Sequence, residues 1–171
     1  VTGLGDLQQA ITEFASRAAE KLRSQHSQAG QVLCFIRTSP FRVEDAQYSR
    51  SISVPLHRPS SDSPVLVQAA LMGLQALYRP GYLYAKAGVM LLDLNSAYDC
   101  QYELALEQEP ENTNRAKLMQ TLDGINSRYG CGTVQLASAG LEGSARLWST
   151  RQERLTQGYT TRWDELAVAR A

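Results

Sequence analysis

The sequence has few cysteines and few histidines. Its 171 residues include three cysteines and two histidines. Cys34, Cys100 and Cys131 are odd in number and form no Cys-x-x-Cys pair, so neither a disulfide framework nor a zinc site is indicated. We expect three reduced thiols, with Cys34 buried in a strand. His26 and His57 accompany no serine or cysteine nucleophile arrangement, so surface histidines are a better interpretation than catalysis.

Long apolar runs are also absent. No run approaches the roughly 20 apolar residues that a membrane-spanning helix needs, so no membrane partner is expected. The first residues contain neither an initiator methionine nor the basic and apolar regions of a signal peptide. We therefore interpret the chain as a fragment of a larger cytoplasmic protein.

There is no excess of charge of either sign, because 17 Lys and Arg balance 17 Asp and Glu. A free-standing nucleic-acid-binding protein is usually basic, so this balance argues mildly against strong independent binding to DNA. The charges are unevenly distributed, with acidic residues gathered in 103–111 and arginines in 146–170. Arginines near Trp148 and Trp163 are typical of a basic and aromatic binding surface, although ordinary amphipathic structure explains them as well.

Three segments have the pattern of helices. In 6–24, apolar residues recur at spacings of three and four, with Asp6 as the expected N-cap. A second helix is expected to begin with Ser63 as its N-cap and to end before the Pro-Gly pair at 80–81. A third helix is expected in 115–129.

Three segments, 31–38, 51–56 and 82–93, have the composition of strands. Strict alternation in 51–56 predicts a half-buried strand, and Pro55 in it favours a sheet edge or a bulge. A short fourth strand is expected at 133–137.

The order helix, strand, strand, helix, strand favours an α+β fold, with two helices packed on one face of a small, mostly antiparallel sheet. A small α/β extension is expected to follow. The second sheet face should carry small, polar or basic residues, namely Ser51, Ser53, Lys86, Gly88, and Arg37 or Thr38. Such a face suits solvent or a flat polar partner.

An apolar peptide interrupts the acidic segment after the third strand. Residues 101–106 read Gln-Tyr-Glu-Leu-Ala-Leu, and 107–114 have the composition of a solvated linker. The Gln101 side chain can hydrogen-bond at the mouth of a pocket that Leu104 and Leu106 fill. This spacing is that of a docking peptide, and folding back onto its own sheet is the alternative.

Four segments, in the same order, resemble the C-terminal part of UmuC-type proteins. These proteins are the polymerase subunits of bacterial DNA polymerase V, within the Y-family of translesion DNA polymerases. The segments are 17–24, 38–41, 84–91 and 159–162. The resemblance implies a little-finger-like DNA-binding domain in 1–97, a linker with a clamp-binding peptide in 98–113, and the UmuC-type C-terminal extension in 114–171.

The resemblance also implies that the little finger contacts the backbone of template-primer DNA. Lys86 is the first candidate for such a contact, and Gly88 beside it would allow close approach of a phosphate. A solvated lysine on an open sheet is the alternative, and Met90 stands where the wider family often has a basic residue. The secondary candidates are Arg37, Thr38, Ser51 and Ser53.

Further partners follow from the resemblance: the sliding clamp at Gln101, Leu104 and Leu106, a UmuD-type accessory protein, and RecA. Clamp peptides usually end in an aromatic residue, whereas Glu107 follows Leu106 here. The strand that precedes the first helix in the family is absent, so an unpaired sheet edge would favour self-association.

Nothing in the chain resembles the paired metal-binding carboxylates of the family's catalytic core. No nucleotide transfer and no cofactor are therefore expected of this fragment, while the parent polymerase would use Mg²⁺. The predicted function is DNA positioning and clamp docking, without catalysis, for an error-prone polymerase in DNA damage tolerance and SOS mutagenesis. The alternative is a protein-interaction domain without nucleic-acid contact.

Overall fold

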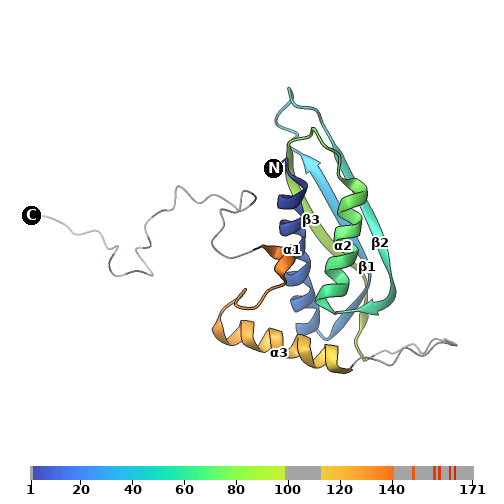
Figure 1. The fold of residues 1–171 in the computed structure, drawn as a ribbon, viewed down its shortest axis with the longest axis vertical. Helices are drawn as coiled ribbons and strands as arrows, with labels where there is room; N and C mark the ends of the chain where they lie inside the picture. Colours follow the sequence, from blue (N-terminus) through green and yellow to red (C-terminus); the bar gives the residue numbers. More distant parts are fainter. Residues whose placement is uncertain are drawn as a thin grey trace, which may run out of the picture.

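Three antiparallel strands and two covering helices form the body of the protein. The computed structural model describes residues 2–98 and 113–140 and the isolated positions 148, 156, 158, 162 and 164. The strands β1 (Ser27–Thr38), β2 (Ser49–Ser60) and β3 (Tyr84–Ser96) form one sheet in the order β2-β1-β3. The helices α1 (Leu4–Ser24) and α2 (Ser63–Leu77) cover one face of it (Figure 1). The expected α+β fold is confirmed.

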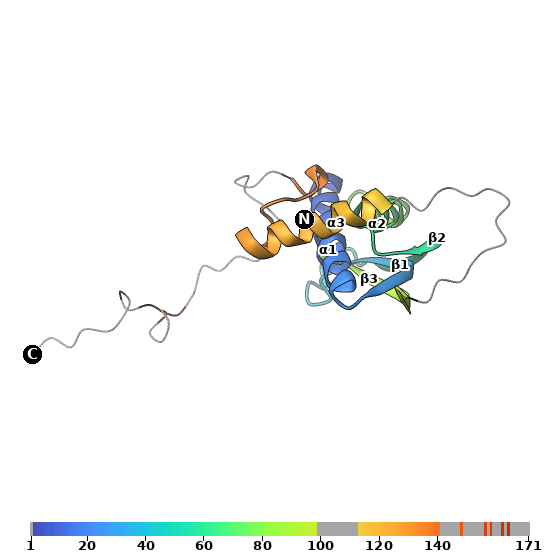
Figure 2. The same ribbon diagram turned by 90° about the horizontal axis from the view of Figure 1, so that it is seen from below.

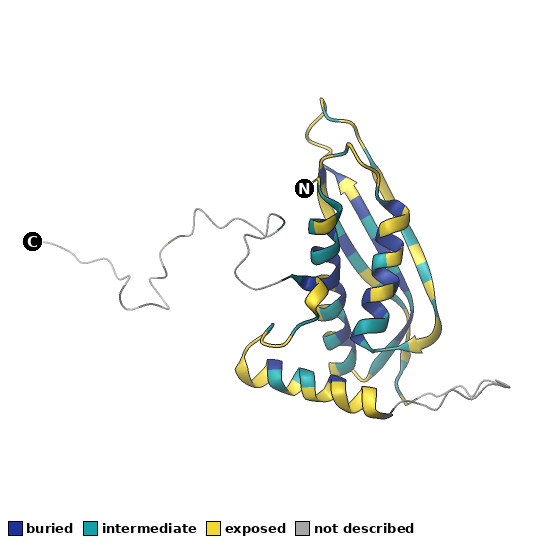
Figure 3. Cartoon of the chain, viewed as in Figure 1, coloured by how far each residue is buried: buried dark blue, intermediate teal, exposed yellow. Residues whose placement is uncertain are grey.

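The core lies between the two helices and the sheet (Figure 3). Even-numbered residues of β1 are buried under the helices, because side chains of a strand alternate between its faces. The fully buried side chains include Ile11, Val32, Cys34, Ile36, Leu66 and Leu74. Helix α2 packs closely on the sheet at Gly73, where an added Cβ would lie 3.1 Å from the Cβ of Cys34.

The ends of the elements differ from the sequence predictions by a few residues. Gly3, not Asp6, is the N-cap of α1. Asp62, not Ser63, is the N-cap of α2, because its carboxylate accepts a hydrogen bond from the amide of Val65 at 3.1 Å. The strand expected at 133–137 is absent, and a short 3₁₀ helix, η1 (Ala137–Ala139), lies there instead.

A β-bulge at the start of β3 changes which of its residues face the helices. Arg37 pairs with Lys86, whereas Thr38 pairs with Tyr84, so Ala85 is an extra residue in β3. The bulge turns Tyr84 toward the helices, where it is buried, although strict alternation predicted that it shares a face with Lys86. Its hydroxyl donates to the carbonyl of Arg79 at 2.8 Å and accepts from the amide of Arg79 at 3.0 Å.

Tyr84 is the centre of a tyrosine cluster at this end of the sheet. The ring centroids of Tyr48, Tyr78 and Tyr82 lie 6.1, 5.9 and 6.3 Å from that of Tyr84. Burial raises the pKa of Tyr84, and the hydrogen bond with Arg79 opposes that shift. Tyr78 and Tyr82 thus pack against Tyr84 around the turn between α2 and β3, and Tyr48, just before β2, joins them.

Helix α3 (Thr113–Tyr129) crosses the end of α1 and the start of α2 (Figures 1 and 2). Two arginine–aspartate pairs attach it. Arg23 in α1 donates from Nε and Nη2 to the carboxylate of Asp123 at 2.6 Å each, and from Nη1 to the hydroxyl of Ser63 at 2.9 Å. Arg115 in α3 donates to both carboxylate oxygens of Asp62 at 3.0 and 2.8 Å.

We expect the pair Arg23–Asp123 to stabilise the docked position of α3. In a double-mutant cycle with Arg23→Met and Asp123→Ala, the coupling should be on the order of 1–3 kcal/mol, because the pair is bidentate and mostly buried. The measured quantity is the opening free energy of α3 from amide hydrogen exchange. The exposed pair Arg42–Asp45 is the control, with a coupling below about 0.5 kcal/mol. Equal coupling in both cycles would contradict this role.

The buried thiol of Cys34 should make stability fall at alkaline pH. Burial raises its pKa from 9.0 to about 12. The unfolded chain therefore loses this proton above about pH 9, whereas the folded protein keeps it up to about pH 12. Across this window, the unfolding free energy should fall by about 1.4 kcal/mol per pH unit more steeply than in Cys34→Ala. Urea denaturation under reducing conditions measures both slopes, and parallel slopes would disprove the assignment.

Candidate nucleic-acid interface

The sheet face opposite the helices consists of cross-strand rows with one residue from each strand. From the β1–β2 hairpin inward, the rows in the order β2, β1, β3 are Ser49–Arg37–Lys86, Ser51–Phe35–Gly88, Ser53–Leu33–Met90 and Pro55–Gln31–Leu92. We call this surface the open face. No position in these rows is acidic, and both basic residues stand in the first row.

The first row concentrates positive charge. Arg37 and Lys86 are exposed, and within the described part of the chain neither side chain has a hydrogen bond or an ion pair. Neighbouring strands are about 4.8 Å apart, so the two charges stand side by side. Unpaired cations on a surface without acidic residues attract an anion.

A solvent-open hollow lies beside this row, between β1 and β2. It encloses about 520 Å³, and its lining consists of Leu33, Phe35, Ile36, Arg37, Ser49, Arg50 and Ser51. Sequence reasoning missed Ser49, because the alternation was read only from residue 51, whereas β2 begins two residues earlier. Arg50 pairs with Ile36, so its side chain lies on the helix side of β2 although the residue borders the hollow. Extending the strand until a residue faced Arg37 would have found Ser49.

Gly88 does not have the position that was expected for it. It is buried, and an added Cβ would lie 2.5 Å from Cζ and 2.6 Å from Cε1 of Phe35. The Phe35 ring therefore occupies the space above Gly88. The lack of a side chain at Gly88 accommodates this ring, and the expected close approach of a phosphate does not fit here.

Thr38 is not on the open face. It is 5% exposed and lies on the helix side of β1. Its hydroxyl donates to Oε1 of Gln47 at 2.9 Å and accepts from the amide of Tyr48 at 3.0 Å. The expected contact of Thr38 with a ligand on the open face is therefore wrong, because an even-numbered residue of β1 faces the helices.

The other predicted residues divide into two groups. Ser51 and Ser53 are exposed on the open face with Arg37 and Lys86, and the Ser53 hydroxyl donates to Oε1 of Gln31 at 2.8 Å. The predicted clamp-binding residues, Gln101, Leu104 and Leu106, lie outside the described residues.

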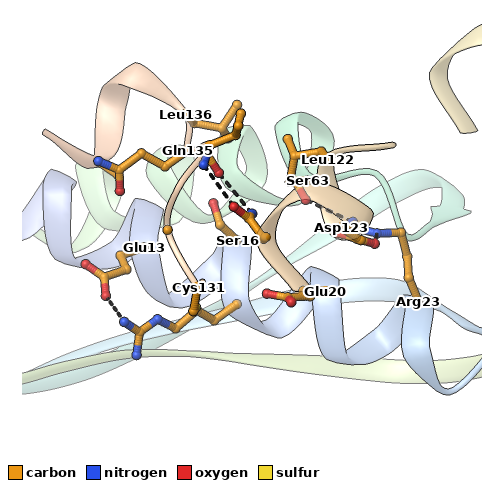
Figure 4. Close-up of a pocket in the computed structure, with 15 residues that line it drawn as sticks. Glu13, Ser16, Glu20, Arg23, Ser63, Leu122, Asp123, Cys131, Gln135 and Leu136 are labelled. Atoms are coloured by element: carbon orange, nitrogen blue, oxygen red, sulfur yellow. Dashed lines mark hydrogen bonds and ion pairs between the residues drawn. The ribbon is translucent and has the colours of Figure 1, made fainter. Parts of the chain in front are cut away.

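A smaller and more enclosed cavity of about 180 Å³ lies on the helix side, between α1, α3 and residues 131–139 (Figure 4). Its charged lining is largely paired internally, Arg17 with Glu13 and Arg23 with Asp123. The buried amide of Asn126 donates to the carbonyl of Val134 at 3.0 Å and accepts from its amide at 2.9 Å. The remaining charged residue of the lining is acidic, Glu20, so this cavity does not attract an anion as the open face does.

The described residues offer no sign of a metal site, since no three His, Cys, Asp or Glu side chains among them are placed to hold an ion. No described helix combines the length and the apolar character needed to cross a bilayer. His26 ends the turn after α1 and His57 lies on β2, so the two histidines are on different elements.

Two family models match the chain. Residues 1–104 match the impB/mucB/samB family C-terminal domain, and residues 116–169 match a domain of unknown function, DUF4113. The first match contains the whole sheet with α1 and α2, and the second contains most of α3.

Curated relatives align over almost the whole chain. It is 40% identical over 170 residues to protein ImpB of Salmonella typhimurium, which covers 99% of this chain and 39% of that protein. It is 37% identical over 166 residues to protein UmuC of Salmonella typhimurium strain LT2, covering 97% and 38%. It is 41% identical over 169 residues to protein MucB of Escherichia coli, covering 99% and 39%. The chain thus spans about two-fifths of the length of these relatives. It belongs to the impB/mucB/samB family, and the resemblance to UmuC-type proteins that its sequence indicated is confirmed.

Proposed function

We propose that this chain positions template-primer DNA for an error-prone translesion polymerase. The observation that carries the proposal is the row Ser49–Arg37–Lys86 on the open face. Two cations without described partners stand there beside hydroxyl groups, on a surface whose rows contain no acidic residue. Arginine and lysine at such a position bind phosphate oxygens, and serine hydroxyls add hydrogen bonds to them.

Contacts of this kind hold the backbone of DNA without reading its sequence. Binding should therefore be similar for duplexes of different sequence and should weaken as salt rises, because bound phosphates release counterions. Lys86, Arg37, Ser51 and Ser53 are the proposed contacts from the sequence, and Ser49 joins them from its pairing with Arg37. In this proposal the chain transfers no nucleotide. That reaction, with its Mg²⁺, belongs to the remainder of the parent protein, in the cytoplasm.

The segment between β3 and α3 is proposed to dock on the sliding clamp through Gln101, Leu104 and Leu106. The described residues before this segment are held to the body, because the amide of Ala97 donates to the carbonyl of His26 at 2.8 Å. After it, Arg115 binds Asp62. A docking peptide between two such anchors would begin and end at the end of the sheet opposite the row Ser49–Arg37–Lys86, because β3 runs from Lys86 toward Ala97. A UmuD-type protein and RecA are proposed as further partners of the parent protein.

A protein-interaction role is the second candidate function. Met90 is 54% exposed and Leu94 is 55% exposed, and both lie on β3, an edge of the described sheet. An exposed apolar edge strand can pair with another chain, so self-association along β3 is part of this candidate. Duplex binding by the isolated chain distinguishes the two functions.

Reversing the charge of Lys86 should weaken duplex binding. For Lys86→Glu, we expect about tenfold lower affinity at low salt, because a charged hydrogen bond to phosphate is lost. The slope of log affinity against log salt should fall by about one. Fluorescence anisotropy with a labelled duplex measures both. The control is Lys21→Glu, which makes the same charge change at an exposed site on α1, across the sheet from the open face. Equal affinities for the two variants would remove Lys86 from the interface.

Replacing two side chains of the proposed clamp peptide with alanine should abolish clamp binding. We expect the double variant Gln101→Ala, Leu104→Ala to lose measurable binding to the sliding clamp, because it removes the glutamine that would hydrogen-bond at the pocket mouth and one of the two leucines that would fill the pocket. Surface plasmon resonance with immobilised clamp measures this. Gln120→Ala, an exposed glutamine on α3, should bind as the unaltered chain does. Unchanged clamp binding by the double variant would disprove the docking role.

A further inference from the structure

We infer that the hollow between β1 and β2 binds an unpaired nucleotide of single-stranded DNA. The inference rests on the proposed function, because it uses the same open face. It goes further in naming a second kind of DNA contact, in which a base stacks on Phe35 while its phosphate binds the neighbouring Arg37. A duplex on the first row requires only backbone contacts.

The hollow combines two kinds of chemistry in a small space. Arg37 supplies positive charge, and Ser49 and Ser51 supply hydroxyl groups on the same face. Within the described residues, the Arg37 side chain has no hydrogen bond or ion pair. Phe35, which pairs with Ser51, is the aromatic residue of the lining. No acidic residue lines the hollow, so nothing in its lining repels an anion.

The position of Phe35 leaves part of its ring available. The far end of the ring lies above Gly88 in β3, and the same side chain lines the hollow toward β2. Phe35 is half-buried and, unlike the clustered tyrosines around Tyr84, has no aromatic side chain stacked on it in the described part of the chain. Contact with Gly88 limits its motion, so stacking would cost little side-chain entropy.

Positive charge beside an aromatic ring indicates which kind of ligand fits the hollow. A free phosphate would bind Arg37 and leave the Phe35 ring in water, whereas an apolar peptide would cover the ring and leave Arg37 without an anion. A nucleotide satisfies both, because it joins an anionic phosphate to an aromatic base. Consecutive rows are roughly 7 Å apart along a strand, so Arg37 and Phe35 are close enough to contact one nucleotide.

The base must be unpaired. In a duplex, each base face is covered by the next base pair, so a protein side chain cannot stack on it without unstacking the helix. In a single strand the faces are accessible, and aromatic side chains bind them with little sequence preference. The open face would therefore hold the duplex by the first row and an adjoining single-stranded stretch of template by the hollow.

The test compares single-stranded and duplex DNA on the 171-residue chain. The probe is an oligo(dT) strand with one central 2-aminopurine, whose fluorescence is quenched on stacking, and a duplex of equal length is the comparison. For Phe35→Leu, we expect about fivefold to a hundredfold weaker binding of the single strand and loss of quenching. Duplex affinity should change less than twofold. Phe35→Tyr, which keeps the ring, should retain both signals.

A second variant keeps the test independent of the packing around Phe35. Arg37→Ala alters an exposed side chain on the open face and should weaken single-strand binding, whereas Arg50→Ala, an exposed arginine whose pairing with Ile36 places it on the helix side of β2, should not. Single-strand binding that is unchanged in both Phe35→Leu and Arg37→Ala would overturn the nucleotide site. If Lys86→Glu still weakened duplex binding, the proposed function would stand without it. Absence of binding to either DNA would overturn both.

Discussion

The two-residue alternation of β1 is the constraint on which the rest of the structure depends. As the central strand of the described sheet, β1 gives its even-numbered residues to the core under α1 and α2. Burial of Val32, Cys34 and Ile36 fixes the register, because a slip of one residue would exchange the two faces. The same register brings Arg37 beside Lys86 and Phe35 beside Gly88. Core and candidate interface are therefore two sides of one strand.

Periodicity in the sequence was sufficient for the helices, the three strands and most of the open face, because burial enforces these patterns over many residues. Contacts between strands were harder to predict from the sequence. The bulge at Ala85, which turns Tyr84 inward, has no signal in the alternation of β3. Gly88 looked like a place for a ligand because the sequence does not show that Phe35 lies across from it. Ser49 was missed for a similar reason, since only its pairing with Arg37 places it in the first row.

Helix α3 joins the two regions that the family models separate. Arg23 donates to α3 through Asp123 and to the start of α2 through Ser63, so one guanidinium connects three helices. Asp62 has a comparable double role, because it caps α2 and binds Arg115. The charged part of this attachment depends on ionic strength, whereas the buried Met119 adds an apolar contact that does not. The body and α3 can thus differ in stability although they are in contact.

The absence of acidic residues from the rows of the open face has a consequence for how the molecule meets DNA. Nothing acidic in these rows offsets Arg37 and Lys86, so the first row carries a local positive charge. A polyanion attracts a local charge of this kind and turns that part of the sheet toward itself. Since the net charge of the chain is zero, orientation, more than capture, would be the electrostatic contribution of this chain, which suits a part that a larger protein carries to its substrate.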